Sequence, residues 1–223
     1  MAFGLPFALL GFGLVLGLAP QDPAGPRFAT ADTPLPALPT PEPGVTGVLT
    51  LRPYPLLHIG AGSDKRTLLL AGDGKQRPPG DLAGLDGQRV TAAGFLLSRG
   101  DIAMLVLGAP PVARGDSAPP PREFLGRWRI TGEICDGKCA ADGMRPGTGI
   151  AHRACAALCL DGGIPAVFVS EAPLLGHAYL LLASTEGGPM GPALRPLIGR
   201  RITLEGQVER LGRLLVFRAE PPA

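Results

Sequence analysis

Short apolar or alternating runs, bounded by glycine, aspartate and proline, recur along most of the chain. Such runs are typical of β-strands in small all-β domains. Gly100 and Gly212 each lie between two runs and predict tight hairpin turns, because glycine adopts positive φ without strain. The predicted strands cover residues 45–51, 67–71, 89–97 and 102–107, and then 129–135, 166–170, 178–183, 201–210 and 213–219.

The two groups of strands resemble each other in sequence. Residues 85–91 (LDGQRVT) match residues 197–203 (LIGRRIT) at an offset of 112, and two glycines further along keep the same offset. Apolar matches alone occur often by chance, but spaced glycines at one constant offset indicate an internal repeat.

The first strand of each copy matches at a different offset. Residues 45–49 (VTGVL) correspond to residues 130–134 (ITGEI) at an offset of 85. The difference from 112 is 27 residues, which predicts an insertion in the second copy between Ile134 and Phe168. The stretches 83–87 and 193–199 are expected to form a short helical turn before the next strand.

Four or five short strands in each copy predict a small antiparallel barrel of the OB type, with a small sandwich as the alternative architecture. The expected fold is therefore mainly β, with two tandem OB-like barrels, a Cys-rich helical insertion in the second and an N-terminal transmembrane or signal helix. The predicted segments are 1–20 (signal anchor or signal peptide), 21–44 (Pro-rich linker), 45–109 (first unit), 110–122 (Pro-rich linker) and 123–223 (second unit, insertion 135–165).

Residues 2–19 carry no charge and would span about 27 Å as a helix, close to the hydrocarbon thickness of a bilayer. Cleavage after Ala19 would make this stretch a signal peptide. Pro20 and the lack of a preceding basic residue favour a retained anchor instead. Eight prolines in residues 20–44 predict an extended stalk, so we expect a membrane-anchored protein with its domains on the periplasmic or extracellular side.

Composition limits the classes of function. The net charge is +2, the apolar fraction is 45%, and only 11 of the 223 residues are aromatic. That balance disfavours a nucleic-acid partner, because single-strand binders need a basic groove with stacking aromatics. Without an evident nucleophile–base set, we do not expect an enzyme.

All four cysteines lie in one window of 25 residues, at positions 135, 139, 155 and 159. Residues 150–160 are rich in alanine and leucine and predict a short helix. On that helix His152, Cys155 and Cys159 would share a face, and Cys139 would approach from the preceding loop.

Two interpretations of this window remain open. Cys139, His152, Cys155 and Cys159 would suit zinc or another soft metal, with Asp136 as a partner of His152 and Met144 as a further soft ligand or a gap-filling side chain. Alternatively, Cys135 and Cys139 form disulfides with Cys155 and Cys159, in which case no cofactor is needed.

The string Gly132-Glu-Ile-Cys-Asp136, followed by Cys139, His152-x-x-Cys155-Ala-x-x-Cys159 and Gly162-Gly163, resembles a little-studied family of exported bacterial OB-like domains. The resemblance covers about residues 128–219 and implies a secreted or membrane-anchored domain with no established activity. It carries over Asp136, Cys139, His152, Cys155 and Cys159. Cys135 is an addition here; three cysteines with one histidine favour a metal, whereas four cysteines restore an even count for disulfides.

Two functions follow as expectations. The first is a membrane-tethered, non-catalytic extracytoplasmic protein whose insertion is a disulfide staple or a binding element. The second is a metal-binding accessory protein of a membrane complex.

Overall fold

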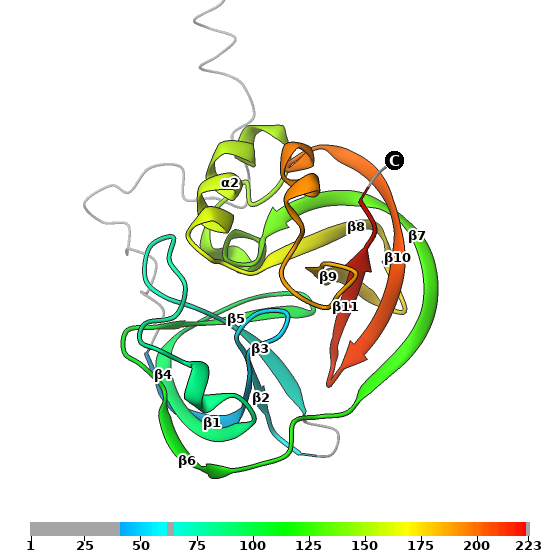
Figure 1. The fold of residues 1–223 in the computed structure, drawn as a ribbon. Coiled ribbons are helices and arrows are strands. Elements are labelled where there is room, and N and C mark those ends of the chain that lie inside the picture. Colours follow the sequence, from blue (N-terminus) through cyan, green and yellow to red (C-terminus); the bar gives the residue numbers. More distant parts are fainter. Residues whose placement is uncertain (1–40, 62–64, 222–223) are drawn as a thin grey trace, which may run out of the picture. The chain divides into compact units, whose positions relative to one another are not determined.

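The computed structural model describes residues 41–61 and 65–221 (Figure 1). The predicted anchor at residues 2–19 and all but the last residues of the first linker lie outside the described residues and stay predictions. Within the described ranges, no helix has the length and apolar character needed to cross a membrane. All described elements belong to one compact unit, Pro39–Ala223.

The first barrel closes five strands in the order β1-β2-β3-β5-β4, with β4 returning to pair with β1. Strands β3 and β5 are parallel, and the other neighbours are antiparallel. A single 3-10 turn, η2, precedes β4. The bounds are β1 Pro41–Thr50, β2 Leu56–Ile59, β3 Arg66–Ala71, η2 Ala83–Leu85, β4 Gln88–Arg99 and β5 Ile102–Leu107.

The second barrel repeats this order with β7, β8, β9, β11 and β10, and its parallel pair is β9 with β11. The prediction of two tandem small barrels is thus confirmed, although each barrel contains one parallel pair and is not wholly antiparallel. The bounds are β7 Arg122–Asp136, β8 Ala166–Leu174, β9 His177–Ala183, η5 Pro192–Leu197, β10 Arg201–Leu211 and β11 Leu214–Ala219.

The pairing register reproduces the offsets found in the sequence. Thr46 faces Thr91 between β1 and β4, and Thr131 faces Thr203 at the equivalent place between β7 and β10. The hydroxyl oxygens of the two pairs lie 2.9 and 2.8 Å apart. Offsets of 85 for the first strand and 112 for the fourth therefore relate corresponding residues of the two barrels.

The repeated glycines allow backbones to approach closely where the strands bend. A Cβ at Gly47 would overlap the carbonyl oxygen of His58, and one at Gly132 would overlap that of Val169. The same holds for the fourth strands, where a Cβ at Gly94 would overlap the Val106 carbonyl oxygen and one at Gly206 that of Arg218. Glycine is therefore required at these four positions by the close approach of a neighbouring backbone.

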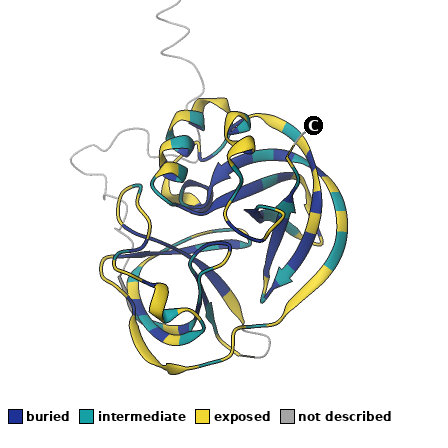
Figure 2. Ribbon diagram, viewed as in Figure 1, coloured by how far each residue is buried: buried dark blue, intermediate teal, exposed yellow. Residues whose placement is uncertain are grey.

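The insertion separates β7 from β8, within the predicted range of residues 135–165. The pairs Leu49–Leu57 and Ile134–Phe168 show that β2 and β8 correspond at an offset of 111. Twenty-six residues are therefore added before β8, and one more between β8 and β9. The insertion contains η3 Cys139–Gly143, the 3-10 turn η4 Ile150–His152 and helix α2 Arg153–Asp161, whose outer surface is exposed (Figures 1 and 2).

The two barrels share a hydrophobic core. Strand β3 is buried at every position after Arg66, since Leu68 and Leu70 fill the first barrel while Leu69 and Ala71 belong to the cluster that fills the second. Such two-sided burial explains the continuous apolar run. The first barrel contributes to the shared cluster Tyr54, Leu56, Leu69, Ala71, Ile102, Met104 and Val106.

Two strands were not expected from the sequence. Strand β2 is only four residues long and follows Pro53 and Pro55, so its pattern is too short to recognise. Strand β6, Val112–Asp116, lies inside the predicted linker 110–122 and pairs with β4. Its five residues contain no proline, so their backbone N–H groups can take part in the ladder.

Candidate metal centre

Three cysteine sulfurs converge in the insertion. Cys139 comes from η3, while Cys155 and Cys159 lie one turn apart on α2. The three Sγ atoms all lie within 4.8 Å of one another. Thiolates bound to zinc at about 2.3 Å lie roughly 3.8 Å apart around a tetrahedral centre, so small movements would bring these sulfurs onto one ion.

The first barrel contributes an ammonium group to the same place. Lys75, in the loop between β3 and β4, has its Nζ 2.7 Å from Cys155 Sγ and 3.5 Å from Cys159 Sγ. A cation in this position favours the thiolate form of Cys159 and would offset negative charge gathered by several thiolates.

The loop that carries Lys75 is held against the insertion by its backbone. The Arg77 N–H donates to the Gly162 carbonyl at 2.8 Å, and Lys138 Nζ donates to the carbonyls of Gly72 and Gly74. Gly162 has to be glycine, because a Cβ there would overlap the Lys75 carbonyl oxygen. The end of α2 is therefore shaped to receive this loop of the other barrel.

A fourth sulfur lies beside the three thiols. Met144 follows η3, and its Sδ lies 3.6 Å from Cys155 Sγ. Its side chain is 45% exposed and Cys155 is half-buried, whereas Cys139 and Cys159 are buried. The sulfur cluster thus opens to solvent on the side of Cys155 and Met144.

The thiols influence one another's protonation. A hydrogen bond from the Cys139 thiol, together with the nearby Lys75 ammonium, lowers the pKa of Cys159 to about 7. The same hydrogen bond and burial raise the pKa of Cys139. The Cys155 and Cys159 thiols in turn raise the pKa of Lys75, which stays protonated at neutral pH. The lowered pKa of Cys159 favours its thiolate form, which is the form that binds a metal ion.

His152 and Asp136 form a separate pair behind the thiols. His152 Nε2 lies 3.1 Å from Asp136 Oδ2, and Asp136 Oδ1 accepts the Cys139 backbone N–H at 2.9 Å. Both side chains are buried, at 3% and 0% exposure. The contact between Asp136 and His152 expected from the sequence is present, and through it the pair fixes the backbone of one thiol residue.

Cys135 points to this second group and not to the three sulfurs. Its thiol donates to the Gly147 carbonyl at 2.7 Å, and its Sγ lies within 4.8 Å of ligand atoms of Asp136 and His152. Burial raises the pKa of Cys135 and keeps it a neutral thiol. All four cysteines are free, with no pair at disulfide-bonding distance.

Of the four ligands suggested by sequence, the structure brings together Cys139, Cys155 and Cys159 and places His152 with Asp136. A continuous helix would have put His152 over Cys155, but His152 ends the 3-10 turn and α2 begins at Arg153. His152 precedes the first turn of α2, and its imidazole contacts Asp136 at the end of β7 instead of joining the cysteines. The sequence did not indicate that Lys75 belongs to the site, because Lys75 lies in the other repeat.

Comparisons with protein-family models, with curated proteins and with solved structures find no match for this chain. The resemblance to exported OB-like domains therefore stays a prediction.

Proposed function

We propose that the protein binds one soft metal ion through the thiolates of Cys139, Cys155 and Cys159. The carrying observation is the convergence of three sulfurs within 4.8 Å beside a lysine ammonium. Soft thiolate donors select zinc, monovalent copper and related ions. This proposal corresponds to the second function expected from the sequence, a metal-binding accessory protein of a membrane complex.

The surroundings of the sulfurs support a metal site over a disulfide staple. A staple would use Cys135 with the other three, yet the Cys135 thiol donates to the Gly147 carbonyl and groups with Asp136 and His152. A disulfide within the three-thiol group would use two cysteines and leave the third without a disulfide partner in that group. A metal with three sulfur ligands uses every member of the group.

We also propose that the two barrels are of the OB type and that the second barrel carries the metal site. Their shared strand order is consistent with the OB type, and the insertion enters the loop between the first two strands of the second barrel. Membrane attachment through residues 2–19 and a partner within a membrane complex stay predictions alongside this proposal.

The test is anaerobic titration of the reduced full chain with Zn²⁺ and, separately, with Cu⁺. We expect one ion per chain by elemental analysis, and slower alkylation of the half-buried Cys155 once the ion is bound. Cys139→Ser and Cys159→Ser should each weaken binding by at least about a hundredfold, since a ligand is lost.

Cys135→Ser is the matched control, because a serine hydroxyl keeps the hydrogen bond to Gly147 and the residue lies outside the three-sulfur group. It should bind metal like the parent. Equal binding by all three variants would overturn the proposal. A native protein with no free thiols and no metal would favour the disulfide staple instead.

A further inference from the structure

The three thiols are short of one ligand for a four-coordinate ion, and this shortage bears on which ion the site takes. The fourth zinc ligand in proteins is a cysteine, a histidine, a carboxylate or a water. Here the imidazole and carboxylate expected from the sequence, His152 and Asp136, contact each other in a buried pair. The remaining cysteine, Cys135, donates to a backbone carbonyl.

The side chain that does lie at the right distance is a thioether. Met144 Sδ is 3.6 Å from Cys155 Sγ, close to the roughly 3.8 Å that separates neighbouring ligands around a tetrahedral ion with bonds of about 2.3 Å. Thioether sulfur is a ligand for monovalent copper and stands outside the usual zinc set.

The position of Met144 also suits a ligand better than a packing role. At 45% exposure it contributes little to a core, and a methionine that only fills a gap would be buried. Gly143, just before it, has no room for a Cβ beside the Lys138 carbonyl, which fixes the turn that delivers Met144 to the thiols.

Building on the proposed function, we infer that the site is selective for Cu⁺, held by the thiolates of Cys139, Cys155 and Cys159 and the thioether of Met144. Binding forms four copper–sulfur bonds, displaces the thiol protons to solvent and involves no change of oxidation state. Lys75 offsets one of the two negative charges left on the complex. The ion is reached from the exposed side, at Met144 and Cys155.

One substitution tests the inference, because it should change the affinity for Cu⁺ much more than the affinity for Zn²⁺. Met144→Leu preserves volume and removes the thioether sulfur. We expect it to lower Cu⁺ affinity about tenfold or more, measured anaerobically against bicinchoninate, and to change Zn²⁺ affinity less than about twofold. X-ray absorption of the copper-loaded parent should show four sulfur neighbours, and that of the variant three.

Met190→Leu is the control, because Met190 is half-buried elsewhere and its backbone N–H bonds to Tyr54. It should change neither affinity. Unchanged copper affinity and sulfur count in Met144→Leu would overturn the inference, as would an equal loss for both ions, and the three-thiolate proposal would survive either result. Failure of the parent to bind either ion would overturn both.

Discussion

At the scale of single residues, Asp136 holds together the buried side of the site. Its two oxygens receive the Cys139 backbone N–H and contact the His152 imidazole. Asp136→Ala would leave both partners buried without a bond, and we expect the free energy of unfolding to fall by about 2–4 kcal/mol. Urea denaturation measures this change.

Asp136→Asn is the comparison, because its side-chain amide has the size of the carboxylate and its oxygen still accepts from the Cys139 backbone N–H. It should cost about 1 kcal/mol. Equal stability of the parent and Asp136→Ala would show that the pair does not support the site.

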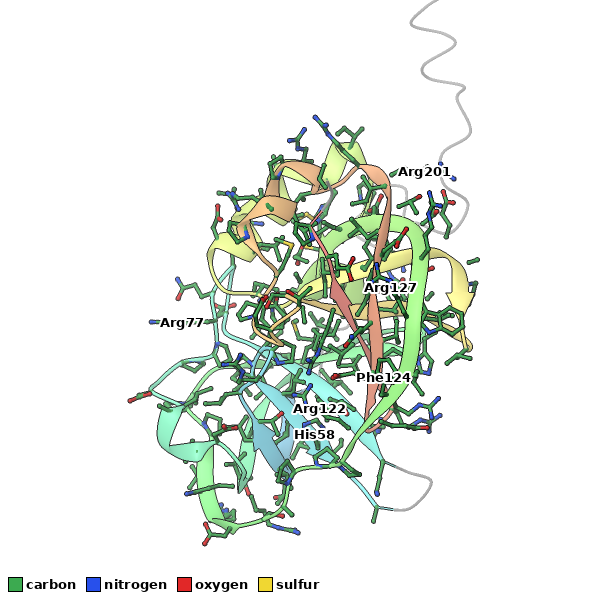
Figure 3. All side chains as sticks on the ribbon, turned by 45° about the vertical axis from the view of Figure 1, so that its right-hand side comes forward. His58, Arg77, Arg122, Phe124, Arg127 and Arg201 are labelled. Atoms are coloured by element: carbon green, nitrogen blue, oxygen red, sulfur yellow. The ribbon has the colours of Figure 1, made fainter. Side chains whose placement is uncertain are left out.

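His58 gives a second prediction at this scale, on the dependence of stability on pH. Its ring nitrogens lie 2.9 Å from the Thr50 hydroxyl and 3.1 Å from the Thr67 hydroxyl, and Arg122 of the second barrel lies near it (Figure 3). Burial, and then the charge of Arg122, lower the pKa of His58 to about 4 from its ordinary value of 6.5.

Because the unfolded chain takes up the proton first, stability should fall as the pH drops from about 6.5 towards 4. The loss assigned to this residue is on the order of 2–3 kcal/mol. His58→Gln removes the titrating group, so urea denaturation at pH 7 and pH 4.5 should show a smaller difference than in the parent. The same difference in both proteins would contradict the assignment.

At the scale of strands, we predict that replacing the equivalent glycine of either barrel lowers stability. Gly94→Ala and Gly206→Ala each place a methyl group against a backbone carbonyl that has little freedom to move. We expect a loss of about 1–3 kcal/mol or more from each substitution. Gly84→Ala is the control, with open space around its Cβ position. Thermal melts that rank Gly84→Ala with the other two would contradict this account.

The strands also show how far the sequence leads. Offsets of 85 and 112, read from a few glycines and threonines, predict the internal repeat, and residues related by these offsets occupy equivalent pairs in the two barrels. Strand β2 escaped prediction because four residues after two prolines carry no usable period. The pattern predicts the helix of the insertion, but it does not show that α2 begins only at Arg153 and that the His152 imidazole contacts Asp136.

At the scale of the whole molecule, the site is built from both repeats. The second barrel supplies every thiol, and the first supplies Lys75 on a loop that docks at the end of α2. No local pattern could have shown this, because 80 residues separate Lys75 from Cys155. The shared core explains why the contact is possible, since β3 leads directly into the loop.

Lys75→Gln tests the contribution of the first barrel. It removes the positive charge beside the thiolates, and we expect metal affinity to fall about tenfold for Zn²⁺ and for Cu⁺. Lys65→Gln, also in the first barrel, is the control and should bind like the parent. Titration at low and high salt should show a larger effect of Lys75→Gln at low salt, where its charge is less screened. Unchanged affinity at both salt concentrations would remove Lys75 from the site.

The central claim is that three thiolates and no imidazole hold the ion. X-ray absorption at the zinc edge, on full-length protein loaded with one Zn²⁺, tests it most directly. We predict three sulfur neighbours at about 2.3 Å, no imidazole scattering and an unchanged spectrum in His152→Gln. A spectrum with imidazole scattering that disappears in His152→Gln would contradict the claim and restore the ligand set of Cys139, His152, Cys155 and Cys159.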